Sequence, residues 1–165
     1  MKVGKIAALA ATTALLAVSM VGTANAVSAD KWDSQVIGDV RIDENDATVA
    51  YVTARYTCPS GATPHLWVSV KQAEGRGADP LLKEEGSSGY AAAWSQSHPS
   101  SQVVCDGKWH VDTFTVDQTE VVPWSPEPIG FGTLTAGQTY AQFCLLDGSS
   151  EDGPIGFSMR FAAIR

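Results

Sequence analysis

The sequence predicts an all-β protein, built as an antiparallel β-sandwich or barrel. Apolar and polar residues alternate with a period of two in most segments after residue 35, which is the pattern of half-buried strands. Clusters of Gly, Pro, Asn, Asp and Ser separate these segments and supply turns. No segment after residue 35 has a convincing helical period. We count eight or nine short strands in this pattern, which is typical of a sandwich or barrel.

Two strands in the first half of the expected domain are the clearest. Residues 48–58 are rich in Val, Tyr and Thr, and one face of this strand carries Ala50, Val52, Ala54, Tyr56 and Cys58. Residues 65–72 also alternate, with Leu66, Val68 and Val70 on one face and Trp67, Ser69 and Lys71 on the other. A weaker strand is expected at 35–43, followed by a polar turn at 44–46.

The middle of the chain is expected to be less regular. Residues 73–88 form a long loop with one helical turn at 81–85, and residues 89–96 form an irregular strand. The dipeptide Asp106-Gly107 then favours a type I′ turn, in which both central residues have positive φ. It predicts a hairpin between 101–105 and 108–116.

The last third of the chain is expected to hold three more strands. A proline-rich extended connection at 122–128 precedes strands at 129–134, 139–146 and 156–164. In the last of these, the residues on one face are Phe157, Met159, Phe161 and Ala163. A glycine-rich acidic loop at 147–154 connects the last two strands.

Residues 1–26 are expected to be a secretory signal peptide. Lys2 and Lys5 precede an uncharged apolar run at 6–21, and residues 23–26 end in the small-x-small pattern of a cleavage site. The apolar run is shorter than the ~20 residues that span a bilayer. We therefore expect a secreted protein with one domain at 27–165, long enough for a single core.

The acidic charge excludes two classes of partner. The chain carries 11 basic and 18 acidic side chains, a net charge of -7, and the expected leader removes two lysines. The mature balance is thus -9, with the basic residues scattered. Nucleic-acid binding and anionic membrane docking need clustered Lys or Arg, so neither is expected.

Residues 134–140 resemble the tyrosine corner of fibronectin type III and immunoglobulin-like domains, with Ala136 where Pro is usual. Four segments (55–58, 68–72, 104–107 and 137–144) are similar to small exported actinobacterial Ig-like domains of unknown function. This resemblance implies an Ig-like β-sandwich and an exported location. It implies no catalytic residue, because the family has no assigned activity.

Three cysteines in an exported domain predict one disulfide and one remaining thiol. Spacing does not choose among the three pairings. The resemblance to the exported Ig-like domains implies Cys58–Cys105. The rival is Cys58–Cys144, which would copy the immunoglobulin inter-sheet bridge, although Cys144 shares a strand face with Gln142 and not with the apolar residues around it.

No motif predicts an enzyme, a metal or a cofactor. His65, His98 and His110 are far apart in sequence, and the chain has no HExxH, CxxC or G-x-S-x-G motif. The acidic clusters at 43–46 and 147–152 lack the pattern of an EF-hand loop, so we interpret them as solvated turns. We expect a buried structural thiol at Cys144, which lies mid-strand.

The five tryptophans are the remaining candidates for function. We expect Trp109 to be buried, and we take Trp67 and Trp124 as candidate surface aromatics for an extracellular protein or glycan. The leading hypothesis is a non-catalytic, exported Ig-like module for binding or envelope association. The alternatives are a small-molecule carrier of the chromoprotein type and a carbohydrate-binding module.

Overall fold

The computed structural model describes residues 31–84, 87–121, 125–149 and 155–165. The expected leader lies outside this range. Within it the chain forms three short 3-10 helices, Pro80–Lys83, Ser87–Tyr90 and Ser100–Gln102, and eight strands. The strands are β1 (Asp33–Val36), β2 (Arg41–Ile42), β3 (Ala50–Thr57), β4 (Pro64–Gln72), β5 (Ala93–Ser97), β6 (His110–Val116), β7 (Gly137–Asp147) and β8 (Ile155–Ile164). The predicted all-β class is confirmed, and none of the described helices is long and apolar enough to span a membrane.

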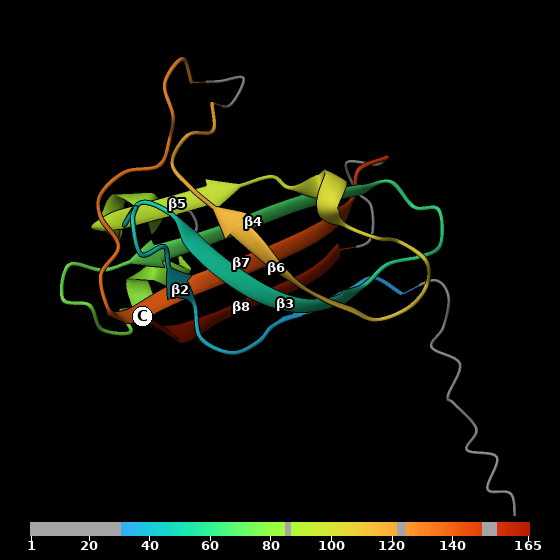
Figure 1. The fold of residues 1–165 in the computed structure, drawn as a ribbon, viewed down its shortest axis with the longest axis horizontal. Helices are drawn as coiled ribbons and strands as arrows, with labels where there is room; N and C mark the ends of the chain where they lie inside the picture. Colours follow the sequence, from blue (N-terminus) through green and yellow to red (C-terminus); the bar gives the residue numbers. More distant parts are fainter. Residues whose placement is uncertain (1–30, 85–86, 122–124, 150–154) are drawn as a thin grey trace, which may run out of the picture.

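The strands form two four-stranded antiparallel sheets. In the first, β3 pairs with β6 along 50–56, and β1 and β2 pair with opposite ends of β3. Since a strand has two edges, β1 and β2 share the edge that β6 leaves open. The second sheet has the order β5-β4-β7-β8. Figure 1 shows β3 and β6 in front of β4, β7 and β8.

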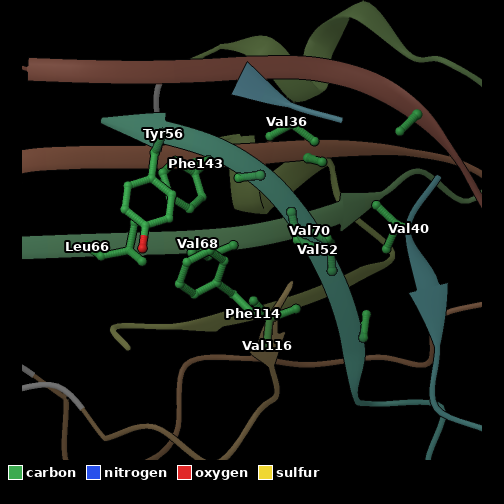
Figure 2. Packing of buried hydrophobic residues seen from close by; sticks show 14 of the residues in the cluster. Val36, Val40, Val52, Tyr56, Leu66, Val68, Val70, Phe114, Val116 and Phe143 are labelled. Atoms are coloured by element: carbon green, nitrogen blue, oxygen red, sulfur yellow. The ribbon is translucent and has the colours of Figure 1, made fainter. Parts of the chain in front are cut away.

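The core lies between the two sheets, as the alternation predicts. The predicted inner faces of 48–58 and 65–72 are buried, and β7 contributes Ala141, Phe143 and Leu145. Figure 2 shows aromatic side chains among these aliphatic residues. The Phe114 and Phe143 ring centres are 5.2 Å apart, and Tyr56 lies 6.0 Å from each. Each fully buried large apolar side chain contributes about 1.5–3 kcal/mol.

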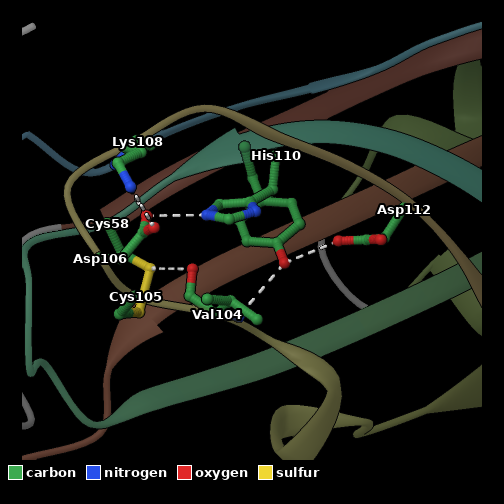
Figure 3. Close-up of a disulfide and its surroundings, with 8 residues drawn as sticks. Cys58, Val104, Cys105, Asp106, Lys108, His110 and Asp112 are labelled. Atoms are coloured by element: carbon green, nitrogen blue, oxygen red, sulfur yellow. Dashed lines mark hydrogen bonds and ion pairs between the residues drawn. A yellow bond between two sulfur atoms is a disulfide. The ribbon is translucent and has the colours of Figure 1, made fainter.

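A disulfide joins Cys58, after β3, to Cys105, before β6 (Figure 3). This confirms the pairing that the resemblance implied, and Cys144 is a buried thiol. Beside the bridge, the Tyr56 hydroxyl donates to Asp112 Oδ2 at 2.9 Å and accepts from the Val104 N–H at 3.2 Å. Burial raises the pKa of Tyr56 to about 12, so this phenol keeps its proton.

The predicted hairpin at 101–116 is wrong. Residues 100–102 form a 3-10 turn, β6 pairs with β3, and Gly107 has φ +77° while Asp106 has no positive φ. The disulfide holds Cys105 against the end of β3, and the Gly107 N–H bonds to the Cys58 carbonyl at 3.1 Å. Residues 103–107 therefore pack on the loop after β3 and do not form a partner strand for β6.

Two other expected elements are shorter than predicted. The strand at 129–134 is reduced to one bridge between Phe131 and Trp94, and β5 begins only at Ala93 because residues 87–90 form a 3-10 turn. The extended connection predicted at 122–128 falls partly outside the described residues.

The connection at 134–138 is fastened by Gln72. The Gln72 amide donates to the carbonyls of Thr135 and Gln138 and accepts from the Thr135 N–H. The Tyr140 ring lies 5.1 Å from that of Phe161 on the outer side of the sheet. The side-chain bonds that hold this corner thus come from β4.

Candidate functional site on the outer face of the second sheet

The candidate site is the side of the β5-β4-β7-β8 sheet that points away from the core. Alternation along each strand places every second side chain there. We call this surface the aromatic face and define it by Trp94, Gln96, Trp67, Ser69, Lys71, Tyr140, Gln142, Cys144, Phe157, Met159 and Phe161. The register aligns these residues in rows, so that Trp67, Cys144 and Phe157 lie side by side on neighbouring strands.

The aromatic face exposes large apolar side chains. Phe157 is 61% exposed and Met159 is 40% exposed, both on β8, and Ile155 at the start of that strand is 49% exposed. Trp67 is half-buried two strands away. The solvent side of an antiparallel sheet is ordinarily polar, and large exposed apolar patches mark interaction surfaces.

The polar side chains of the aromatic face are buried and bonded to one another. Ser69 Oγ donates to Gln142 Oε1 at 2.9 Å, and Gln142 Nε2 donates to Met159 Sδ at 3.6 Å. The Trp67 indole N–H donates to Gln96 Oε1 at 3.0 Å. These bonds pair the buried polar groups with one another, whereas the exposed side chains of Phe157 and Met159 on β8 are apolar.

Two lysines lie over aromatic rings at one end of the face. The Lys71 ammonium is 5.5 Å from the Trp94 ring centre, and the Lys83 ammonium is 5.4 Å from that of Phe161. Burial lowers the pKa of Lys71, because desolvation disfavours its charged form. Leu82, beside Lys83, packs with Tyr140 in a small buried cluster. Residues 80–83 therefore cover this end of the face.

The opposite end carries two histidines and a carboxylate. The ring centres of His65 and His98 are 5.2 Å apart, and His98 Nδ1 lies 2.7 Å from both Glu120 oxygens. Sequence spacing hid this cluster, since it is the β4–β5 pairing that brings the two histidines together. Among the described residues, no group of three or more His, Cys, Asp or Glu is placed to hold a metal ion.

Cys144 lies in the middle of the face, in register with Trp67 and Phe157. It is buried, and burial raises its pKa to about 11. At neutral pH the side chain is a protonated thiol, which is a poor nucleophile. The buried structural thiol expected from the sequence agrees with this placement.

In the two acidic turns, at 43–46 and 147–149, Asp side chains accept hydrogen bonds from nearby backbone N–H groups. Asp43 accepts from the N–H groups of Asn45 and Asp46 and from the Tyr51 hydroxyl at 2.6 Å, and the Tyr51 bond is the main cause of its lowered pKa. Asp147 accepts from the hydroxyl and N–H of Ser149, which lower its pKa. The rest of the second acidic cluster, residues 150–152, lies outside the described part of the chain.

The predicted tryptophans have different outcomes. Trp67 belongs to the aromatic face, whereas Trp124 falls outside the described residues. Trp109 is only half-buried, which corrects the expectation of burial. It lies just before β6, with the Arg55 guanidinium 4.2 Å from its ring centre. The residues that sequence reasoning did not single out are Phe157 and Met159, although it placed them on one face of their strand.

No protein-family model matches the chain, and neither a curated protein nor a solved structure matches it.

Proposed function

We propose that this protein is an exported, non-catalytic binding module with an Ig-like β-sandwich fold, and that it binds through the aromatic face. The strand order supports the Ig-like assignment. The pairing of β1 and β2 with β3 and of β3 with β6 corresponds to strands A, B and E, and the order β8-β7-β4-β5 corresponds to G, F, C and C′. A parallel bridge between Val40 and Ile164 links the first segment to the last strand.

Export is supported by two independent features. Residues 1–26 have the order of a signal peptide, and the Cys58–Cys105 disulfide belongs to an oxidising compartment. The acidic charge agrees with a protein that stays dispersed outside the cell.

The observation that carries the binding function is the exposure of Phe157 and Met159 on the same sheet face as Trp67. Aromatic and Met side chains are enriched at protein interfaces. A glycan site also needs outward polar groups, and the amides of Gln96 and Gln142 are buried and bonded internally. The chemistry of the face therefore favours a protein surface as its partner.

Site-specific photocrosslinking tests this proposal. Benzoylphenylalanine replaces Phe157 in the protein exported by its own source organism, and the culture is irradiated. A matched control carries the same group in place of Thr113, which is exposed on the outer face of the first sheet. We expect adducts of discrete mass from position 157 and none from position 113. Absence of adducts at 157, or equal labelling at both positions, contradicts the proposal.

A further inference from the structure

We propose that the partner of the aromatic face is a second copy of this chain, packed face to face about a two-fold axis. This inference rests on the proposed function, since it names the occupant of the same surface. A two-fold interface requires a patch that is complementary to itself. Three properties of the aromatic face meet this requirement: its uncharged centre, its opposite charges at two corners, and its dimensions.

The centre of the face carries no charge. The middle of the patch consists of Ser69 and Gln142, and Cys144, Met159 and Phe157 extend this uncharged area to the edge strand β8. The whole chain has a net charge of -7, so two copies repel each other over most of their surface. Contact through an uncharged apolar area adds no like-charge pairs and removes exposed Phe and Met side chains from water.

Opposite charges mark two diagonal corners of the face. The Lys83 ammonium lies over Phe161, on the edge strand β8. The Glu120 carboxylate is bound to His98, which directly follows β5 at the other edge of the sheet. His98 extends the register of β5 to the level of Trp67, four residues along the sheet from the row of Phe161. One corner therefore carries the Lys83 ammonium, and the diagonal corner carries the Glu120 carboxylate.

The two sides of the face are nearly equal in length, so the Lys83 corner of one copy can lie against the Glu120 corner of another. Three strand spacings from β5 to β8 amount to about 14 Å, and four residues along a strand amount to about 13 Å. A two-fold axis can lie in the interface along the other diagonal of the face, the one that passes through Phe157. This axis places Lys83 of each copy against Glu120 of the partner subunit. The same axis brings Phe157 onto Phe157 of the partner subunit, and Met159 over Trp67 of the partner subunit. The strands of the two copies then cross near right angles, a known mode of sheet packing.

Sedimentation equilibrium of the purified exported protein over a wide concentration range tests the dimer. We expect dimers in the unaltered protein and a dissociation constant weakened by about tenfold or more in Phe157→Arg, because like charges then meet on the axis. Met159→Lys is a second variant of the same kind. Val111→Arg is the matched control, since Val111 is 57% exposed on the outer face of the first sheet. Circular dichroism verifies that each variant is folded.

Charge reversal tests the diagonal arrangement. Lys83→Glu is expected to weaken the dimer, and adding Glu120→Lys is expected to recover part of the loss. A monomer at all concentrations, a dimer insensitive to Phe157→Arg, equal weakening by Val111→Arg, or a double variant no tighter than Lys83→Glu overturns the inference. A monomer that is nevertheless crosslinked at position 157 to a different protein overturns this inference and leaves the proposed function standing. A monomer that gives no adduct at 157 removes both.

Discussion

The outer faces of the two sheets contain the same kind of hydrogen bond in opposite surroundings. On the first sheet, the hydroxyl oxygens of Thr53 and Thr113 lie 2.9 Å apart and are exposed. On the second, Ser69 Oγ lies 2.9 Å from Gln142 Oε1, and both side chains are buried. The first face follows the usual rule of polar residues outward, whereas on the second these polar side chains are buried and Phe157 and Met159 are exposed.

The two faces also differ in how their larger side chains are covered. The larger outward side chains of the first sheet lie in pairs, with Arg55 over Trp109 and the Arg41 guanidinium 5.1 Å from the Tyr51 ring centre. In each pair the cation covers the ring and keeps its own N–H groups available to water. On the second sheet, Phe157 and Met159 have no comparable cover among the described contacts. The first face thus covers its large side chains with cations, whereas the second leaves large apolar side chains exposed.

The largest expected effect concerns the disulfide at the end of the first sheet. Replacing both Cys58 and Cys105 by Ala is expected to lower the free energy of unfolding by about 4 kcal/mol, the loop entropy for a separation of 47 residues. Urea unfolding with and without reductant measures it. The aromatic face lies on the other sheet, so the folded variant should keep the dimer affinity of the unaltered protein. A reductant-insensitive midpoint in the unaltered protein argues against the bridge.

The buried Ser69–Gln142 bond and the exposed Thr53–Thr113 bond give the most direct comparison of the two faces. Ser69→Ala leaves the Gln142 carbonyl oxygen buried without its donor, and we expect a loss of about 1–3 kcal/mol in unfolding free energy. Thr113→Ala removes an exposed partner and should change it by less than about 0.5 kcal/mol. Urea unfolding of both variants under one condition checks this. Equal losses of unfolding free energy in the two variants would show that water reaches the Gln142 amide.

Sequence alternation predicts the sandwich interior well. In 50–58 and 66–71 one side is uniformly apolar and the other includes Thr, Ser, Lys or Arg, so the period of two decides which side is buried. The alternation does not decide which side of β8, the edge strand of the second sheet, is buried. Residues 156–164 carry apolar side chains on one face, yet Phe157 and Met159 point to solvent because pairing with β7 turns Ala162 and Ile164 toward the core.

The features that sequence reasoning missed all depend on contacts distant in the chain. The Asp106-Gly107 signal is local, and it is overruled by the bond from Cys105 to Cys58 and by the pairing of β6 with β3. The approach of His65 to His98 requires the β4–β5 register, which spacing in the chain does not contain. The aromatic face needs four strands to be ordered side by side before its residues form a surface.

One substitution on each face tests whether the exposed apolar side chain forms open surface or contributes to the stability of the fold. Compared with the unaltered protein at concentrations too low for the proposed dimer, Phe157→Ser is expected to change the unfolding free energy by less than about 0.5 kcal/mol, because the side chain of one copy is already mostly in water. It should reduce the fluorescence of a bound apolar dye such as anilinonaphthalenesulfonate, whereas Val111→Ser on the first face should not. A large loss of stability in Phe157→Ser means that the ring packs within the fold and does not form open surface.

The smallest expected effect is the acid dependence at the end of the first sheet. A hydrogen bond from His110 at 2.8 Å is the main reason that the pKa of Asp106 falls from 3.8 to about 2, and the Lys108 N–H also contributes. A carboxyl group with a lowered pKa stabilises the fold fully above its unfolded value and loses this contribution as the pH falls toward the folded value. The stabilisation from Asp106 is thus present above about pH 4 and is lost between pH 4 and 2.

Asp106→Asn isolates that contribution from those of the other carboxyl groups with lowered pKa, Asp43, Asp46 and Asp147. These remain in the variant, so both proteins lose stability in acid, and the variant should lose less. Urea midpoints measured at intervals from pH 6 to pH 2 give the two curves, which should converge toward the acid end. Parallel curves would show that Asp106 binds its proton equally in the folded and unfolded chain. In that case the disulfide and the Tyr56 hydroxyl hold the loop, and the charge of Asp106 does not contribute to the free energy of unfolding.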